Sequence, residues 1–543
     1  MTESARNKWL YPVISGALLT AAFPKPGLWL LAWVALVPLI LAIRDADAGT
    51  AFRAGFLAGL VHYLTLLYWV VITMRTYGFL PWWQCIALLV LLASYLALYT
   101  GLFATLLVRL CKKPLQLLLL MPVLWVALEY VRSFLLTGFP WGLLGYSQFN
   151  RLHIIQISDM FGVLGVSFLL VLANAGVCLM LLFAAHRPWG GREVTRRGAV
   201  TALVLPLIAV AAVLGYGSAR LAAVDQALNP AATIRVAAVQ GNIDQAHKWD
   251  PAYQISTARK YVAMTLSAAG KHPDLVVWPE TATPFYFDAS RKLTRLVTDG
   301  VRRAGVYLLT GSPSVEESVS GPPRYFNSAY LVAPDGRVVG RYDKVHLVPF
   351  GEYVPLKWLL SFVGKMVAQV GDFSAGEKGR TLAWGAEKPP LGVQICFEII
   401  FPGLSRALVK NGAGLLVNLT NDAWFKKSAA AYQHFSMTIF RAVENRRSLV
   451  RCANTGISGV IDPAGRIVAS TALFTDAVVN RSVPIMHMTT VYTRFGDVPA
   501  LACLIAVIVL VGLQSGRLRG GGSRLVETSR HRLAAWIRGR RRR

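Results

Sequence analysis

Long apolar runs separated by short polar connections dominate the first 220 residues of the chain. A membrane core about 30 Å thick needs roughly 20 apolar residues of helix. Seven runs come close to that length, at 9–24, 27–43, 52–73, 82–108, 114–136, 160–184 and 198–216, and an eighth covers about 497–515. The first run lacks a convincing cleavage site and is followed at once by another run, which favours a retained helix over a signal peptide. The pattern predicts a polytopic α-helical membrane bundle of about eight spans.

Residues 221–495 show a different pattern, in which short strand-like runs alternate with helical ones. The strand-like runs are 234–239, 275–278, 306–310, 329–332, 392–395 and 415–419. Two turns rich in Pro and Gly, at 334–337 and 462–465, predict hairpins. We therefore expect an α/β sheet with helices on its faces. The predicted domains are a membrane domain at 1–220, a globular domain at 221–495, a last span at 496–516 and a basic tail at 517–543, with 218–232 as the candidate hinge.

Composition and charge agree with a membrane protein. The chain is 55% hydrophobic and 15% charged, with a mean hydropathy of +0.47, which excludes an ordinary soluble protein. Lys and Arg concentrate in alternate connections, so the positive-inside rule predicts that these connections are cytoplasmic and that residues 220–495 lie on the opposite side. Much of the net charge of +28 comes from the tail. We expect the tail to meet anionic membrane lipids rather than nucleic acid, because no recognition motif accompanies it.

Three residues of the globular segment, each at the end of a strand-like run, suggest nucleophilic catalysis: Glu280, Lys344 and Cys396. A thiol with an ordinary pKa of about 8.5 is mostly protonated at neutral pH, so it needs a base and a positive neighbour. Glu280 can supply the base and Lys344 the charge, and Cys396 could then hold an acyl group as a thioester. Taken singly, these residues would be a strand-end carboxylate, a solvated hairpin lysine and a buried core cysteine. Their occurrence together favours catalysis.

The remaining cysteines and histidines give no support for a metal site. Four cysteines fall in or beside the predicted spans, namely Cys85, Cys111, Cys178 and Cys503. No pair has zinc-ligand spacing, and we expect neither a metal nor an organic cofactor. A bridge between Cys396 and Cys452 stays open on sequence alone, and it would block the predicted chemistry. His272, His346 and His434 have no partner at ligand spacing, so we expect surface residues or residues behind the site.

Several motifs together resemble one known family. They are the strand ending in Trp278-Pro279-Glu280, the Tyr342-Asp343-Lys344 hairpin, the Cys396-Phe397-Glu398 elbow, the run 344–355 and the segments 248–251, 418–425 and 454–458. The first three resemble the Glu-Lys-Cys triad of the nitrilase superfamily. With the others, they resemble its membrane-bound branch, the apolipoprotein N-acyltransferases, over nearly the whole chain. One small departure is Phe397, where Tyr is equally expected.

The resemblance implies an α/β nitrilase-like αββα sandwich carried on the membrane bundle. It also implies a bacterial inner membrane protein with its catalytic domain on the periplasmic side. Glu280, Lys344 and Cys396 would transfer an acyl chain from a glycerophospholipid, typically phosphatidylethanolamine, to the N-terminal S-diacylglyceryl cysteine of apolipoproteins. The reaction would be ping-pong through a thioester. Supporting roles would fall to Glu352, Glu398 and Phe397, and substrate-binding or lid roles to Trp249, Asn327, Tyr353, Trp358 and Phe362.

The region 350–380 is too apolar for an ordinary surface loop. We interpret it as a lid that dips into the membrane interface, and a buried helix is the alternative. Two other functions stay open. In a membrane-tethered amidase or hydrolase, water would resolve the same thioester. A transporter or scaffold would have a degenerate domain, but the trio is complete, and Glu129 and Arg132 are explained more simply as a structural ion pair.

Overall fold

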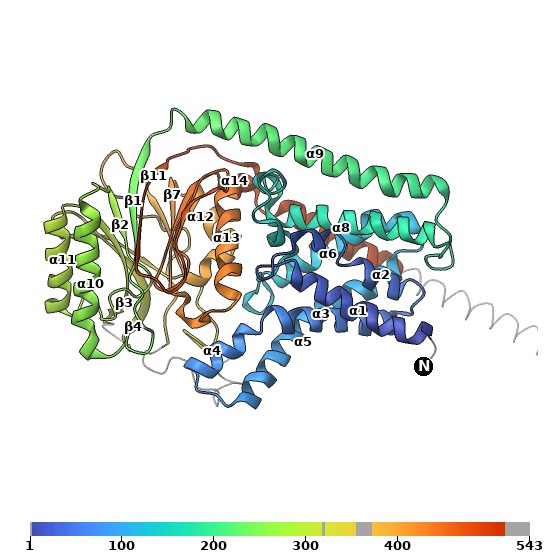
Figure 1. Cartoon of the computed structure of the whole chain (residues 1–543), viewed down its shortest axis with the longest axis horizontal. Coiled ribbons are helices and arrows are strands. Elements are labelled where there is room, and N and C mark those ends of the chain that lie inside the picture. Colours follow the sequence, from blue (N-terminus) through green and yellow to red (C-terminus); the bar gives the residue numbers. More distant parts are fainter. Residues whose placement is uncertain (1–2, 318–320, 355–371, 516–543) are drawn as a thin grey trace, which may run out of the picture.

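The chain forms a helical bundle and an α/β domain that pack side by side (Figure 1). A computed structural model describes residues 3–317, 321–354 and 372–515. The bundle contains, in chain order, α1 (Glu3–Ala21), η1 (Trp29–Trp33), α2 (Val37–Ile43), α3 (Ala48–Leu66), α4 (Trp69–Tyr77), α5 (Trp82–Leu110), η2 (Pro114–Gln116), α6 (Leu117–Arg132), η3 (Leu135–Thr137), η4 (Leu144–Gln148), α7 (Leu152–Ile155), α8 (Ser158–Ala184) and α9 (Arg196–Leu228). After the α/β domain, α14 (Val491–Phe495) and the helix Val498–Ser515 return the chain to the bundle.

Five of the described helices are long and apolar enough to cross a membrane: 82–110, 114–132, 158–184, 196–228 and 498–515. The pair α3 and α4 would make a sixth span, although it is bent by 50°. The apolar helices Trp9–Ala21 and Trp29–Ile43 are shorter. The expected count of about eight spans is therefore not confirmed. The predicted run 52–73 is not one straight helix, because the backbone leaves helical geometry at Leu67.

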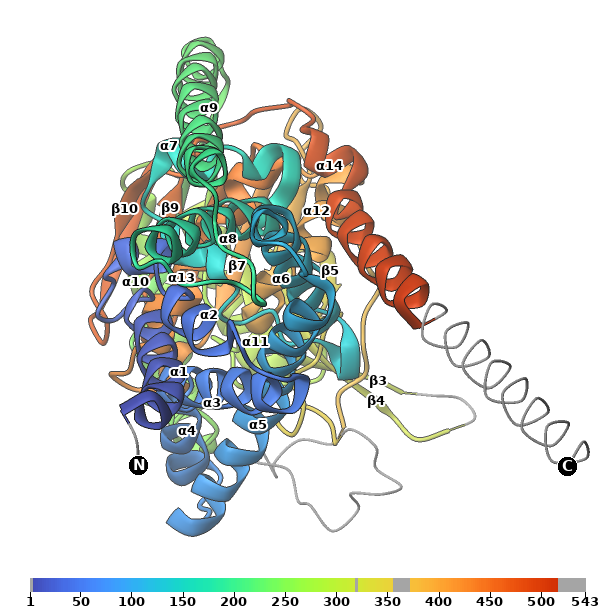
Figure 2. The ribbon, with the colours of Figure 1, turned by 90° about the vertical axis from the view of Figure 1, so that its right-hand side faces the viewer.

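Helix α9 is 33 residues long and runs from the bundle to the α/β domain (Figure 1). The expected hinge at 218–232 is wrong over most of its length. Residues 218–228 continue the helix, because they are rich in strong helix formers such as Ala, Leu, Arg and Gln. Only residues 229–232 separate α9 from the first strand, so the predicted domain boundary at 220 falls inside a helix. Figure 2 shows α9 and Val498–Ser515 on two different sides of the bundle, and both are largely exposed apolar helices that lipid would cover.

The α/β domain contains two sheets. The first has the order β11-β1-β2-β3-β4-β5 and the second the order β10-β9-β8-β7-β6. Their strands are β1 (Thr233–Gln240), β2 (Leu275–Val277), β3 (Tyr307–Glu316), β4 (Arg324–Val332), β5 (Val338–Asp343), β6 (Leu391–Ile395), β7 (Leu415–Thr420), β8 (Ser448–Ala453), β9 (Gly459–Ile461), β10 (Ile467–Ser470) and β11 (Ala477–Pro484). The two predicted hairpins are confirmed, between β4 and β5 and between β9 and β10.

Helices cover the outer face of each sheet, which makes four layers (Figure 1). Helices α10 (Pro251–Ala269) and α11 (Arg291–Ala304) cover the first sheet, whereas α12 (Pro402–Lys410) and α13 (Ala430–Asn445) lie between the second sheet and the bundle. Strands β6, β7 and β8 are parallel neighbours in which every residue is buried, as expected for parallel strands covered on both faces. Their carboxyl ends therefore form a rigid edge on which a site can be built.

Candidate active site

Cys396 lies at the carboxyl end of β6, where the strand turns into η5 (Cys396–Ile400). Its φ angle of +54° is a left-handed conformation that residues other than glycine rarely adopt. Backbone strain at a turn from strand to helix is typical of a nucleophile presented by a buried strand. On the neighbouring strand β7, the side-chain amide of Asn418 donates to the carbonyl oxygen of Cys396 at 3.4 Å, which supports the turn.

Glu280 and Lys344 come from the other sheet. Glu280 lies just beyond the end of β2, and Lys344 directly follows β5. Because the two sheets face each other, the sandwich brings both residues to Cys396, close enough for their charges to affect the pKa of its thiol. The ammonium nitrogen of Lys344 lies 3.7 Å from Oε1 of Glu280. The three residues predicted from the sequence are therefore neighbours in the fold.

Two further side chains fix the geometry of Glu280 and Lys344. Glu352 Oε1 lies 2.9 Å from the Lys344 ammonium, and Glu352 Oε2 accepts a hydrogen bond from the backbone of Val348 at 2.8 Å. The side-chain amide of Asn327 donates to Glu280 at 2.9 Å and to Glu352 at 2.8 Å. Glu280 Oε2 is buried and has no hydrogen-bond partner in the part of the chain that the structure describes. That oxygen is therefore free to receive a proton.

The electrostatics of the site favour a charged Lys344 and a neutral Cys396 thiol. Burial alone would lower the pKa of Lys344, but Glu352 and Glu280 outweigh it and raise the pKa, so the ammonium stays charged. Burial raises the pKa of Cys396 to about 12, and the Glu280 carboxylate adds to this, whereas Lys344 opposes it. A thiol with this pKa is protonated at neutral pH, so a nucleophilic Cys396 would have to transfer its proton to a base during attack.

Glu398 ties the cysteine turn to the segment that bears Lys344. Its carboxylate accepts hydrogen bonds from the backbone of Ile395 at 2.6 Å, Val345 at 2.7 Å and His346 at 3.1 Å, and from the Tyr342 hydroxyl at 3.0 Å. Burial raises the pKa of Glu398 to about 7, although these backbone donors and Lys344 favour the charged form. The carboxylate links the two sheets at the site and does not face Lys344 as a direct ion-pair partner.

A fully buried polar cluster lies behind Cys396, and the sequence reading missed it. Arg451 on β8 donates to Asp422 at 2.8 Å, and His434 Nδ1 lies 3.1 Å from Asp422. The Arg451 charge, after the opposing effect of burial, holds the pKa of Asp422 well below its usual range. Thr420 joins the cluster by donating to Asp422 at 3.0 Å. Two signals in the sequence point toward this cluster: the position of His434, expected at the surface or behind the site, and the segment 418–425, which contains Asp422 and contributes to the family resemblance.

The predicted lid and binding residues take several positions. Asn327 is buried at the centre of the carboxylate network, while Trp249 and Tyr353 are half-buried. Tyr353 is in the turn that carries Glu352, and Trp249 precedes α10. Trp358 and Phe362 lie outside the described residues, as does most of the segment 350–380. Of the three histidines, His272 is exposed, His346 contacts the ring of Phe397 and His434 is buried.

The bundle supports the site from behind through the loop that follows α6. Arg132 donates to the carbonyl oxygens of Phe139 and Trp141 at 3.1 and 2.8 Å, and Glu129 accepts from the Leu144 backbone at 2.7 Å. The expected ion pair between Glu129 and Arg132 is therefore replaced by bonds from each residue to this loop. The loop then contacts residues around the cysteine turn. Phe139 packs against Phe397 with ring centroids 6.4 Å apart, and Trp141 stacks on His434 at 5.5 Å.

Helix α4 contacts the loop that follows β7 in the chain. The hydroxyl of Tyr77 donates to the carbonyl oxygen of Ala423 at 2.9 Å, and that of Thr73 donates to Trp424 at 2.9 Å. The rings of Tyr77 and Trp424 also meet edge to face, 4.9 Å apart. This loop, η6 (Asp422–Phe425), begins with the buried Asp422. The bend between α3 and α4 therefore places a membrane-bundle helix directly against the active-site scaffold.

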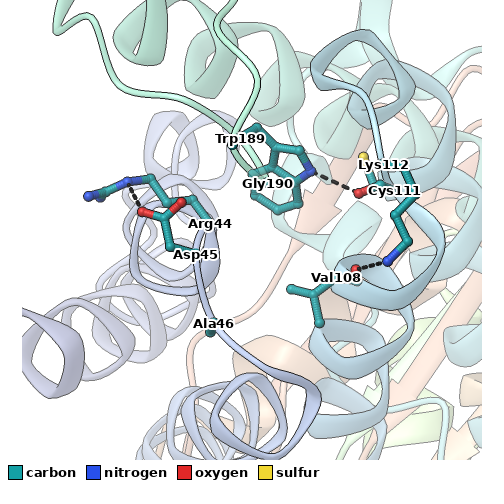
Figure 3. A pocket seen from close by; sticks show the side chains of 9 residues that line it. Arg44, Asp45, Ala46, Val108, Cys111, Lys112, Trp189 and Gly190 are labelled. Carbon is teal, nitrogen blue, oxygen red and sulfur yellow. Dashed lines mark hydrogen bonds and ion pairs between the residues drawn. The ribbon is translucent and has the colours of Figure 1, made fainter.

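A cavity of about 370 Å³ lies between the connections at the end of the bundle away from the α/β domain (Figures 1 and 3). Figure 3 shows Arg44 paired with Asp45 and directed away from Lys112, whose ammonium donates to the Val108 carbonyl at 3.2 Å. The cationic groups do not converge, so we assign no ligand to this cavity.

Within the described ranges, no group of three His, Cys, Asp or Glu side chains could hold a metal ion. Cys396 and Cys452 are both free thiols, which rules out the bridge that the sequence left open.

The fold and the site define a class of protein: a thiol-dependent carbon-nitrogen hydrolase domain joined to a bundle of apolar helices. Two family models match the chain, the apolipoprotein N-acyltransferase N-terminal domain over residues 15–176 and carbon-nitrogen hydrolase over residues 235–490. An apolipoprotein N-acyltransferase of Geobacter metallireducens is 46% identical over 94% of this chain and 95% of its own length. The chain therefore belongs to the apolipoprotein N-acyltransferase family.

Other relatives are more distant. An apolipoprotein N-acyltransferase of Methylococcus capsulatus is 35% identical over 92% of this chain and 94% of its own length. Among solved structures, Nit3 of Saccharomyces cerevisiae, a member of branch 10 of the nitrilase superfamily, matches with 20% identity and a TM-score of 0.36. It covers 46% of this chain and 90% of its own chain, and a score this low adds nothing to the family assignment.

Proposed function

We propose that this chain transfers an acyl chain from a glycerophospholipid, through a thioester on Cys396, to the α-amino group of the N-terminal S-diacylglyceryl cysteine of apolipoproteins. The family assignment supports the lipoprotein substrate and the lipid donor. The observation that carries the chemistry is the buried Oε2 atom of Glu280, which has no hydrogen-bond partner among the described residues. The charge of Glu280 acts on the Cys396 thiol, and Lys344 lies between the carboxylates of Glu280 and Glu352. In this arrangement one carboxylate oxygen is oriented and the other can move a proton.

The first half-reaction forms the thioester. Glu280 takes the proton from Cys396 as the sulfur attacks the ester carbonyl of the phospholipid, and Lys344 and a backbone amide near Phe397 stabilise the oxyanion. The S–C bond forms, the ester C–O bond breaks, and Glu280 returns its proton to the departing lysophospholipid oxygen. Glu280 is then a carboxylate again, ready for the second substrate.

The second half-reaction forms the amide. The α-amine of the lipoprotein attacks the thioester carbonyl while Glu280 takes its proton. The C–N bond forms, the C–S bond breaks, and the proton passes to Cys396, so the enzyme returns to its starting state. No metal or organic cofactor takes part in these steps. A location in a bacterial inner membrane, with the α/β domain in the periplasm, would place the site beside outer-leaflet phospholipids.

Intact mass measurement of the purified protein tests the proposal. Phospholipid alone should add one acyl group to Cys396, because the first half-reaction needs only the donor. A diacylglyceryl peptide with a free α-amine should then remove the adduct as an amide, whereas an N-blocked peptide should leave it in place. A matched control is Cys503→Ser, which changes a cysteine in the last helix and should acylate normally. Loss of the acyl group to water without amide formation would favour the hydrolase, and no adduct at all would refute the covalent mechanism.

A further inference from the structure

A second buried lysine lies at the active site and has no role in the steps above. Lys248 is only 2% exposed, and its ammonium donates to the backbone carbonyl oxygen of Glu280 at 2.9 Å. An ammonium has three hydrogen-bond donors, and burying it away from water is costly unless negative charge is near. Burial accordingly lowers the pKa of Lys248 to about 8, while Glu280 and Cys396 oppose that effect. This lysine therefore senses the charge of the reacting pair.

The segment that bears Lys248 is held firmly on the site. After β1, the backbone of Ile243 donates to the side chain of Asn454 at 2.8 Å, and the Asn421 amide donates to Gln245 at 2.6 Å. Asp250 then caps helix α10 by accepting from Ala252 at 2.9 Å. Both ends of the turn are thus anchored. The position of the Lys248 ammonium is built into the fold and is not the result of a free side chain reaching into the site.

Charge balance gives this placement a function. Glu280 and Glu352 contribute two negative charges, and Lys344 supplies one positive charge. Asp422 has its own partner in Arg451, and Glu398, with a pKa raised to about 7, would add further negative charge at higher pH. Without Lys248 the buried site would have a net negative charge, which opposes the formation of a thiolate. With Lys248 protonated, the charges of the two lysines and the two carboxylates cancel.

We propose that Lys248 is a positioning residue for acyl transfer, whose ammonium balances the second carboxylate charge and keeps the Glu280–Cys396 pair poised for proton transfer. The inference rests on the proposed function, since it assumes that Cys396 is the nucleophile. Lys248 acts through Glu280 and does not itself touch the substrate. A lysine that only held the turn against the Glu280 carbonyl would affect Cys396 equally at every pH. An electrostatic effect of Lys248 on Cys396 should instead disappear when Lys248 loses its proton.

The test measures the rate at which iodoacetamide alkylates Cys396 in the full-length protein, read from the mass of the Cys396 peptide between pH 6.5 and 10. This reaction needs the thiolate but neither lipid nor lipoprotein. Lys248→Met should react about tenfold more slowly than wild type at pH 7, which corresponds to roughly one pKa unit of lost stabilisation. The ratio should fall toward one by pH 10, because wild-type Lys248 loses its own proton near pH 8.

Two further variants keep the test decisive. Lys248→Arg keeps its charge at every pH, so it should react faster than wild type at pH 10, and this comparison holds even if Lys248→Met does not fold. Lys260→Met is the matched control, because Lys260 is a partly exposed lysine of α10 that pairs with Asp476 away from the site. A rate ratio that does not change with pH, or an Arg variant no faster than wild type at pH 10, would overturn the inference. Wild-type acylation by phospholipid, measured separately, reports on the proposed function itself.

Discussion

The ammonium of Lys344 lies closer to Glu352, at 2.9 Å, than to Glu280, at 3.7 Å. The shorter ion pair of Lys344 is therefore with Glu352, which is not one of the three predicted catalytic residues. A single acceptor would let Lys344 neutralise Glu280 and weaken it as a base. Sharing the ammonium between two carboxylates leaves the charge of Glu280 only partly compensated, which suits its proposed role of gaining and losing a proton in each half-reaction.

Replacement of Glu352 with Gln should reduce the rate of Cys396 acylation by roughly 10²-fold. The variant removes the nearest counter-charge of Lys344, so the ammonium should move toward Glu280 and suppress its basicity. The measurement is the single-turnover rate of adduct formation with phospholipid. Glu377→Gln, at an exposed position, is the control and should stay within about twofold. A Glu352→Gln rate equal to that of the control would show that the 2.9 Å pair has no catalytic consequence.

Asn327→Asp should be more damaging at pH 7 than at pH 5.5. The wild-type amide donates to Glu280 and Glu352, and an aspartate would place a third carboxylate against both of them. Protonation of the new group would restore one donor, so activity should recover in part as the pH falls. The comparison is the pH profile of adduct formation for the variant and for Asn327→Leu, which cannot titrate. Identical profiles for the two variants would contradict the donor role of Asn327.

Glu398→Gln should make stability less dependent on pH. The folded pKa of Glu398, about 7, exceeds its ordinary value of 4.5, so the folded state binds more protons between pH 4.5 and 7. The contribution of this group to stability is therefore full below about pH 4.5 and declines as the pH rises to 7, by at most roughly 3 kcal/mol. Thermal unfolding in detergent should show wild type exceeding the variant by more at pH 5 than at pH 8. A difference that grows as the pH rises would reverse the sign and refute the assignment.

A labelling experiment tests the predicted orientation. Pro322→Cys introduces a thiol at an exposed turn of the α/β domain, and Gly520→Cys introduces one in the basic tail. An impermeant thiol reagent applied to intact spheroplasts should label the first and not the second, because the basic connections are expected on the cytoplasmic side. Permeabilised cells serve as the control and should label both. Labelling of Gly520→Cys alone in intact spheroplasts would show the opposite orientation and contradict a periplasmic active site.

Sequence reading was most successful where a property is local. Cys396 directly follows an apolar strand, and the position of a strand depends on a short run of residues. It was least successful where packing overrides composition. Residues 218–228, expected to form part of a hinge, continue α9. His434 is buried behind the site, which is one of its two expected positions, but its stacking on Trp141 of the bundle was not expected. A long-range contact of this kind leaves no periodic trace along the chain.

The sequence by itself determined the hydrophobic runs, the strand-like runs of β1, β2, β3, β4, β6 and β7, and the three reactive residue types, because each depends on chemistry within a few neighbouring positions. Only the tertiary structure decided which side chains share a proton or a charge. Asn327 meets Glu280 across 47 residues and Glu352 across 25, and Lys248 reaches the Glu280 carbonyl across 32. These contacts depend on strand order in the first sheet, on the anchored turn after β1 and on the packing of the two sheets, which bring distant residues together at distances where electrostatic energies are large.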